Sequence, residues 1–339
     1  MRNVSRRDVL KVGAGAAAGT LLPAGIMASQ PTTIRVGGNT EPTMIGIAKG
    51  WFSDAGLKVE VTELPNILQY SNILASGSID LFDGYLPATF WNMVQAGADY
   101  KIIAGSAMAV AAKDGKPARN ARAYVARKDL FDNGSIKTVQ DFKNRKIADF
   151  VPVPPKGKLS PFPVGHTIFG ETFREIDWTY LPNETNIITA LENKYVDGAR
   201  LTTRSAKLAF EKGIAVEIAK ETDYVPEIQV RLVVARGDFL AANKEAVTKY
   251  LKVRLRAQEF LAEIQGGKHK EEFLLIAQKH SKTPPAIALN LVEELEFTDR
   301  ISATDLQNQQ AHFVKVGIQK QVIPLEKVVE SSLLAAAKK

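Results

Sequence analysis

Cysteine is absent from all 339 residues. Its absence excludes disulfides, thiolate metal sites and cysteine nucleophiles, and it leaves the chain compatible with an oxidising or a reducing compartment. Histidine is scarce, and the four histidines, His166, His269, His280 and His312, show no metal-ligand spacing and no H-E-x-x-H pattern. The sequence therefore predicts no metal site.

A basic block with interleaved aromatic residues, the usual mark of a nucleic-acid-binding surface, is also missing. The formal net charge is +7, but the first 28 residues hold four basic residues against one acidic residue, which leaves +4 for the rest. A composition of 45% hydrophobic and 24% charged residues is ordinary for a globular protein. We therefore expect no nucleic-acid partner.

The small, apolar run from Val12 to Ile26 is shorter than the ~20 residues that a membrane-spanning helix requires. It follows the pair Arg6-Arg7 and ends in small residues, which is the order of an export signal. The segment resembles a twin-arginine signal, with cleavage near Ala28. We therefore take residues 1–28 as a signal peptide and expect the mature chain in the periplasm.

Two stretches of the mature chain, residues 74–88 and 190–202, share one pattern. Each reads as the end of a helix, a short turn, and a strand opened by a hydrophobic residue and an aspartate. The matching positions are Leu74 with Leu191, Ile79 with Val196, and Asp80 with Asp197. Two α/β lobes of similar build are the simplest cause of such a repeat.

Predicted strands and helices alternate at short spacing over both halves of the chain, which favours parallel sheets with right-handed crossovers. The strands are expected around residues 33–39, 59–61, 79–82, 102–104, 123–127, 146–150, 180–181 and 215–218, with one at 229–236 that crosses back to the first lobe. Amphipathic patterns at 244–263, 271–280, 286–295 and 302–317 predict a helical tail that packs on the first lobe.

Residues 151–163 carry five prolines and are therefore neither a helix nor a central strand. We expect an extended loop. A long loop in a compact domain is either a lid over a binding site or a surface excursion, and the sequence leaves both open.

Four segments, residues 48–60, 74–80, 136–148 and 190–197, follow the export signal in a characteristic order and spacing. Through them the mature chain resembles the periplasmic substrate-binding proteins of ABC importers, specifically the nitrate/sulfonate/taurine-type group. The resemblance implies an α/β fold of the type II periplasmic binding protein kind, in which each of two lobes is a mostly parallel sheet flanked by helices, with a helical C-terminal tail. We expect the first lobe at 29–110 and 230–339 and the second at 111–229.

The implied function is capture of a small anionic organic solute, a sulfonate or carboxylate, between two lobes that close by hinge motion. A monomer would then deliver this small-molecule ligand to a membrane ABC permease without chemistry, so the resemblance implies no catalytic residue and no cofactor. In that group the ligand contacts come from loops at strand ends. The matching candidates are Asn39, Thr40, Asn66, Gly84, Tyr85, Leu86, Asp149, His166, Thr167, Arg200, Thr202, Thr203 and Arg204.

Each candidate also has a purely structural interpretation. Asn39, Asn66 and Thr202 belong to types that favour caps and turns, and Tyr85 suits either a core aromatic or an aromatic contact between the lobes. Arg200 or Arg204 in a cleft would suit a sulfonate or carboxylate through forked hydrogen bonds, but arginines are most often exposed.

Two alternative functions remain. The fold also resembles thiamine-pyrimidine synthases, although the cysteine-rich motif associated with that chemistry is missing, and a binding protein for a neutral pyrimidine or aromatic ligand would have the same architecture. A hydrolase is disfavoured, because no G-x-S-x-G elbow is present.

Overall fold

The computed structural model describes residues 30–38, 40–63, 70–119, 122–154, 156–160 and 162–339. The predicted signal peptide and two candidate ligand residues, Asn39 and Asn66, lie outside the described residues. Within those ranges, no helix combines the length and apolar character needed to cross a bilayer.

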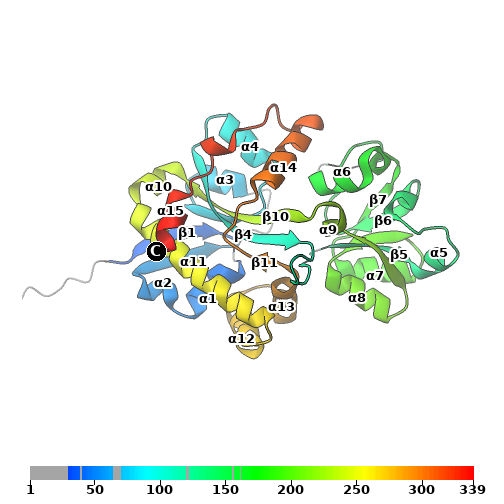
Figure 1. The fold of residues 1–339 in the computed structure, drawn as a ribbon, viewed down its shortest axis with the longest axis horizontal. Helices are drawn as coiled ribbons and strands as arrows, with labels where there is room; N and C mark the ends of the chain where they lie inside the picture. The colour runs from blue at the N-terminus through cyan, green and yellow to red at the C-terminus, as the bar shows by residue number, and fades with distance from the viewer. Residues whose placement is uncertain (1–29, 39, 64–69, 120–121, 155, 161) are drawn as a thin grey trace, which may run out of the picture. The chain divides into compact units, whose positions relative to one another are not determined.

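The first lobe is built on a six-stranded sheet (Figure 1). Its strands are β1 (Thr32–Gly37), β2 (Leu57–Thr62), β3 (Leu81–Gly84), β4 (Tyr100–Val110), β10 (Glu227–Arg236) and β11 (Glu296–Phe297), in the spatial order β11-β4-β10-β3-β1-β2. β1 pairs in parallel with β2 and β3, whereas β10 runs antiparallel between β3 and β4. The sheet is therefore mixed, because the chain returns from the second lobe as a strand that runs in the opposite direction.

The second lobe is built on a five-stranded sheet of the order β7-β6-β8-β5-β9. Its strands are β5 (Ala123–Arg127), β6 (Lys146–Asp149), β7 (Asp177–Tyr180), β8 (Gly198–Leu201) and β9 (Ala215–Lys220). β6 pairs in parallel with β7 and β8, and β5 runs antiparallel to β8 and β9. This sheet is thus also mixed, with its parallel half formed by the predicted βαβ units.

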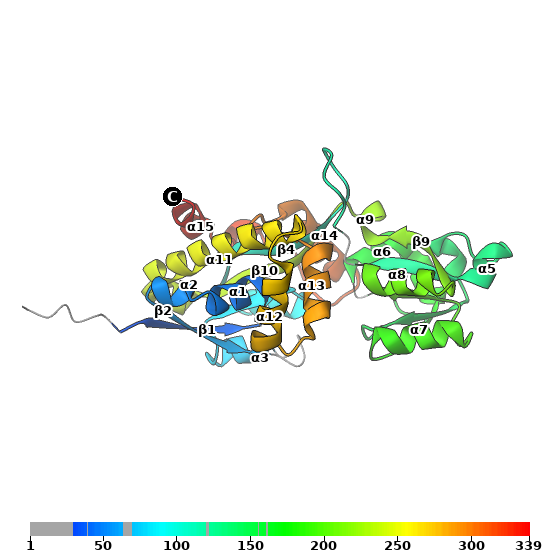
Figure 2. The ribbon, with the colours of Figure 1, turned by 90° about the horizontal axis from the view of Figure 1, so that it is seen from below.

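Helices cover both faces of the first sheet (Figures 1 and 2). Side chains of α1, α11, α12 and α13 share one apolar cluster, and those of α3, α4 and α14 share another. The helices of this lobe are α1 (Glu41–Ala48), α2 (Trp51–Asp54), α3 (Tyr70–Ala75), α4 (Ala88–Gln95), α10 (Gly237–Ala242), α11 (Lys244–Gln265), α12 (Lys270–His280), α13 (Pro285–Glu294), α14 (Ala303–Lys315), η4 (Leu325–Lys327) and α15 (Ser332–Ala337). The predicted helical C-terminal region is confirmed.

The helices of the second lobe enclose an aromatic core. Phe169 contacts the rings of Phe142, Phe173 and Trp178 there, and Phe173 stacks on Trp178, with ring centroids 4.8 to 6.2 Å apart. The elements are α5 (Lys128–Asp132), η2 (Val139–Phe142), α6 (Pro163–Phe169), η3 (Gly170–Glu175), α7 (Glu184–Glu192), α8 (Thr203–Glu211) and α9 (Glu221–Tyr224). The segment between α5 and β6 forms only one short 3-10 helix, η2.

The sequence repeat has the same physical role in each lobe. The carboxylate of Asp80 accepts the Arg35 backbone N–H of β1 at 2.9 Å, and that of Asp197 accepts the Lys146 backbone N–H of β6 at 3.3 Å. The backbone N–H groups of the two aspartates donate in return to the Arg35 and Lys146 carbonyls, at 2.7 and 2.8 Å. Each aspartate therefore closes the turn from a helix onto a neighbouring strand.

Candidate functional site

A cavity of about 350 Å³ lies between the two lobes. We call it the interlobe cavity. The first lobe contributes Tyr85, Ile228, Gln229, Val230 and Gln309, and the second contributes Arg122, Val151, Phe162, Pro163, Val164, Arg200 and Glu221. The volume is within the range of small-molecule sites, and the wall combines apolar side chains with a few polar and charged groups.

The proline-rich loop forms part of this wall. Its described residues, 151–154, 156–160 and 162, contain no helix or strand, and α6 begins at Pro163. Both ends of the loop, at Val151 and Phe162, line the interlobe cavity. The segment thus borders a candidate binding site instead of pointing away from it.

Arg200 of β8 lines the interlobe cavity, but two carboxylates of its own lobe already hold it. Its Nε and Nη2 atoms each lie 2.7 Å from Glu221 Oε1, and its Nη1 lies 3.4 Å from Asp149 Oδ2. Asp149 also accepts the Val151 backbone N–H at 2.9 Å, and burial raises the pKa of its carboxyl. The predicted residues Arg200 and Asp149 are thus in contact, within a buried triad that is completed by Glu221.

Arg122 stands at the boundary of the interlobe cavity, with its guanidinium over the ring of Phe150 at 4.7 Å. Burial lowers the pKa of Arg122, and the charge of Arg200 adds to this effect. The carboxylates of Glu221, Glu184 and Asp149 oppose the shift. Arg122 is therefore a buried cation whose surroundings carry both signs of charge.

Tyr85 follows β3 and reaches the interlobe cavity from the first lobe. Burial raises the pKa of its phenol above the usual range, and the Asp305 carboxylate adds to the rise. The group is therefore a neutral hydroxyl at any ordinary pH, able to donate or accept one hydrogen bond.

A second hollow of about 580 Å³ is lined by Phe150 and by residues of α13 of the first lobe and of α7 and α8 of the second. We call it the α13 groove. Thr202 and Arg204 line it, together with Glu184 and Glu294. Glu294 Oε1 accepts the backbone N–H of Arg204, at 2.8 Å, so that a carboxylate of the first lobe caps a helix of the second.

Thr202 is the N-cap of α8, and its hydroxyl accepts the Ser205 backbone N–H and donates to Glu184 at 2.9 Å. We expect Thr202→Ala to lower the free energy of unfolding by about 1 kcal/mol, the usual cost of a lost N-cap. Thr202→Ser keeps the cap and should retain wild-type stability. Urea denaturation of both variants checks this, and equal losses would show that the cap is not what Thr202 contributes.

Three further candidates are buried in the first lobe. Thr40 donates to the buried Asp83 carboxylate, and Leu86 packs in the core cluster of α3, α4 and α14. Gly84 is buried in β3, where an added Cβ would lie 2.4 Å from the Phe82 ring. These residues shape the loop that carries Tyr85 but do not line the interlobe cavity.

His166 lies on α6, where its ring stacks on His312 of α14 with centroids 4.8 Å apart. Its Nε2 lies 2.9 Å from Lys315 Nζ, and burial together with Lys315 lowers the pKa of His166. His312 Nε2 lies 2.8 Å from the Ser160 carbonyl, so this group connects the two lobes. Thr167 is exposed and donates to the Pro163 carbonyl of its own helix.

The predicted residues therefore fall into separate groups. Tyr85 and Arg200 share the interlobe cavity, whereas Thr202 and Arg204 line the α13 groove and Thr203 begins α8 between them. Sequence reasoning missed Arg122, Glu221, Gln309 and Glu294. Arg122 precedes β5 and Glu221 follows β9, so both lie beside strands in the segments that cross between the lobes. Their position next to these crossings is the sequence signal that could have identified them.

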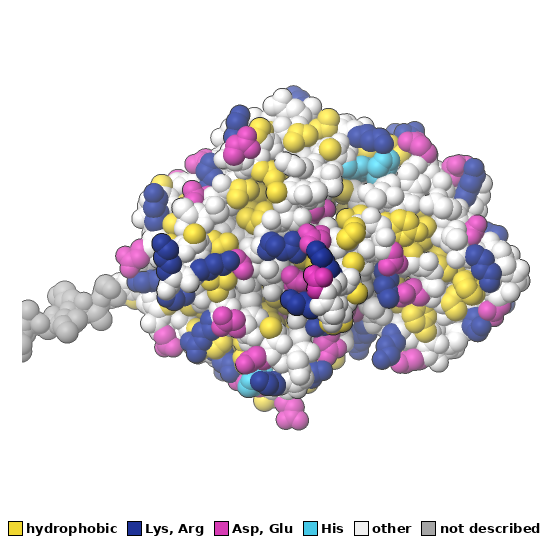
Figure 3. All heavy atoms as spheres, viewed as in Figure 1, with side chains coloured by type: hydrophobic (Ala, Val, Ile, Leu, Met, Phe, Trp, Pro, Cys, Tyr) yellow, Lys and Arg dark blue, Asp and Glu magenta, His cyan; other side chains and the backbone are white. Residues whose placement is uncertain are grey.

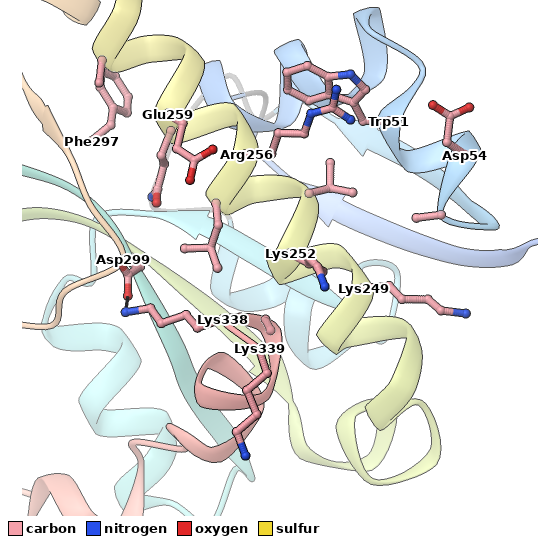
Figure 4. A pocket seen from close by; sticks show the side chains of 16 residues that line it. Trp51, Asp54, Lys249, Lys252, Arg256, Glu259, Phe297, Asp299, Lys338 and Lys339 are labelled. Atoms are coloured by element: carbon pink, nitrogen blue, oxygen red, sulfur yellow. Dashed lines mark ion pairs between the residues drawn. The ribbon is translucent and has the colours of Figure 1, made fainter.

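A larger hollow, of about 870 Å³, lies along α11 on the outside of the first lobe (Figure 4). Arg256 covers the ring of Trp51 there at 4.0 Å, and Lys338 bonds to Asp299 at 2.5 Å. All of its described lining residues belong to the first lobe. Acidic and basic side chains are intermixed over the face of the molecule in Figure 3, without a continuous basic area.

Comparisons with known proteins agree with this architecture. The sequence profile of the family described as "NMT1/THI5 like" matches residues 38–265, and that of the twin-arginine translocation pathway signal matches residues 3–23. The N-terminal signal therefore directs the chain to the periplasm. No curated protein matches the sequence significantly.

Solved structures resemble the chain over most of its length. The periplasmic aliphatic sulphonate binding protein SsuA from Escherichia coli is 19% identical, with a TM-score of 0.64 over 89% of this chain and 92% of that one. The periplasmic nitrate-binding protein NrtA from Synechocystis PCC 6803 is 14% identical, with a TM-score of 0.59 over 90% and 88%. The desulfurization enzyme DSZB is 9% identical, with a TM-score of 0.62 over 91% and 99%.

At these identities the solved structures establish the fold alone: two lobes with the architecture of the periplasmic solute-binding proteins of ABC importers. One enzyme shares it. The family profile extends over more than half of the sequence and includes the strands β2 to β10, which belong to both sheets. The chain therefore belongs to the NMT1/THI5-like family.

Proposed function

We propose that this chain is the solute-binding component of an ABC importer, which captures a small organic molecule in the interlobe cavity and presents it to a membrane permease. The observation that carries the proposal is a cavity of about 350 Å³ whose wall comes from both lobes. A ligand held by both lobes contacts more protein when they are together, so its binding favours closure. Hinge motion of a monomer is sufficient for this cycle.

The ligand is an organic molecule with an anionic sulfonate or carboxylate group. Six apolar residues of the wall, Val151, Phe162, Pro163, Val164, Ile228 and Val230, suit an organic body better than a bare inorganic ion. Arg122 is the cation that would meet the anionic group, and the Tyr85 hydroxyl is a further donor. Neutral aromatic ligands are the second candidate, because both carboxylates beside Arg200 already neutralise it.

Binding is favoured over catalysis by the side chains that line the interlobe cavity. Its described wall contains no lysine, cysteine, serine or histidine that would supply a nucleophile. The one carboxylate in the wall, Glu221, is bonded to Arg200. The solute is therefore expected to leave unchanged, and no cofactor is needed for its capture.

Native mass spectrometry of the mature protein, purified without added ligand, tests this proposal. We expect a non-covalent adduct whose mass, after denaturation, is that of a small organic anion or a neutral aromatic molecule. Tyr85→Ala should lose the adduct, whereas Tyr180→Ala, a change at a 49% exposed ring of the second lobe, should keep it. Covalent attachment to a lysine, or an adduct that survives Tyr85→Ala unchanged, would contradict the proposal.

A further inference from the structure

The Arg200 guanidinium has two edges that could recognise an anion: Glu221 occupies one of them, and Asp149 contacts one nitrogen of the other. The edge formed by Nε and Nη2 is filled by Glu221 Oε1, with both distances at 2.7 Å. The Nη1 atom faces Asp149 at the longer distance of 3.4 Å. The side chains of the three residues are only 16%, 7% and 4% exposed, for Arg200, Glu221 and Asp149 respectively.

The triad belongs entirely to the second lobe. Arg200 lies on β8, Asp149 ends β6, and Glu221 begins α9 at the point where the chain leaves β9. Its geometry therefore does not depend on whether the lobes are together or apart. The arrangement is in place before any ligand arrives.

This occupancy changes what the interlobe cavity can recognise. A sulfonate or carboxylate binds a guanidinium best through two parallel N–H bonds. Glu221 takes the edge formed by Nε and Nη2, and Asp149 competes for Nη1 on the other edge. An anion placed at Arg200 would also face the Glu221 carboxylate, and like charges in a partly desolvated wall repel strongly. The Glu221 carboxylate by itself already offsets the positive charge of Arg200.

We propose that Glu221 sets the charge selectivity of the interlobe cavity: by holding Arg200 it rejects an anionic group at this wall and selects a ligand that presents an N–H or O–H donor there. The inference rests on the proposed function, because it assumes that this cavity receives the solute. It assigns an orientation to an anionic solute, whose charged group lies toward Arg122 and whose donor lies toward Glu221.

Glu221→Gln tests the inference, with propane-1-sulfonate as the probe and isothermal titration as the readout. The glutamine keeps the shape of the side chain but removes its charge and releases Arg200. We expect the affinity for propane-1-sulfonate to rise at least tenfold over the wild type. Glu217→Gln, which removes a charge from the exposed face of β9, should leave the affinity unchanged.

The double variant Arg200→Met/Glu221→Gln should lose the gain, because the released cation is what binds the probe. A gain that survives in the double variant would overturn the inference, as would a folded Glu221→Gln protein that binds the probe no better than the wild type. If Glu221→Gln does not fold, Asp149→Asn takes its place, with a smaller expected gain because its contact with Arg200 is longer.

The outcome can be separated from that of the proposed function. A wild-type protein that carries no solute in native mass spectrometry counts against solute capture. The titration with propane-1-sulfonate measures the charge selectivity of the cavity wall whether or not the wild-type protein carries a solute.

Discussion

Replacement of Arg254 by methionine is expected to lower the free energy of unfolding by about 3–5 kcal/mol, the usual cost of removing one partner from a buried ion pair. Arg254 projects from α11 into the first lobe, where its Nη1 lies 2.6 Å from Asp83 Oδ2 and 2.9 Å from Thr43 Oγ1. Its Nη2 donates to Ser106 Oγ at 2.8 Å. Methionine fills part of the volume but leaves the fully buried Asp83 carboxylate without its cation.

Arg256→Met is the matched control, because Arg256 lies two residues further along α11 and is exposed over the Trp51 ring (Figure 4). Its loss should cost less than about 1 kcal/mol, as for an exposed cation–π contact. Urea denaturation of the two variants makes the comparison. Asp83→Asn in the Arg254→Met background should restore part of the loss, and similar stability of the two single variants would contradict the expectation.

The same pair connects the helical C-terminal region to the proposed binding loop. Asp83 is the penultimate residue of β3, and Tyr85 follows that strand into the interlobe cavity. Burial of the Asp83–Arg254 pair thus fixes the end of β3 against α11. We infer that α11 serves the site by positioning this loop, although none of its described residues lines the cavity.

Local patterns predicted much of the fold. The repeat of a hydrophobic residue and aspartate marks Asp80 and Asp197 correctly as equivalent positions, because each closes a turn through bonds to the adjacent strand. The strand predicted at 123–127 agrees with β5 at both ends. Such elements depend on residues close in sequence, whose alternation and turn chemistry a single chain displays.

The placement of β10 between β3 and β4 depends instead on the return of the chain from the second lobe. No local pattern specifies which strands it joins. The same limit applies to the site: Arg200 was predicted as a ligand contact from its residue type, whereas its bond to Glu221 joins β8 to α9 across 21 positions. Contacts of this kind follow from the completed sheet.

Substitution of Glu294 is expected to change how contact between the two lobes depends on pH. In the α13 groove it joins the lobes through the Arg204 N–H of α8. Burial raises the pKa of its carboxyl from 4.5 to about 7, and Glu184 contributes to the rise, whereas Arg122, Arg204 and the Arg204 N–H oppose it. Protonation of Glu294 therefore favours lobe contact. This contribution is complete below about pH 4.5, is lost as the pH rises to about 7, and above that pH the ionised carboxylate opposes contact.

Glu294→Gln and Glu294→Ala should consequently change the fraction of molecules with the lobes together in opposite directions. Glu294→Gln keeps an acceptor for the Arg204 N–H without a charge, so it should increase the fraction of molecules with the lobes together at pH 8. Glu294→Ala removes the acceptor of that exposed N–H, at a cost of about 0.5–1.5 kcal/mol, and should reduce this fraction roughly 2- to 12-fold even at pH 5.5. If the Glu294 carboxylate only filled space, both substitutions would change the fraction of molecules with the lobes together in the same direction.

Because the chain contains no cysteine, a pair introduced at the exposed positions Ser53 and Lys207 carries spin labels on one lobe each. Their distance distributions report lobe contact at pH 5.5 and 8. His312, which bonds across the lobes to Ser160, is retained in every variant, so the difference between wild type and Glu294→Gln isolates Glu294. That difference should grow with pH, whereas Glu293→Gln, at a residue bonded to Lys270 within the first lobe, should follow the wild type. Parallel pH responses of wild type and Glu294→Gln would show that Glu294 does not control the contact.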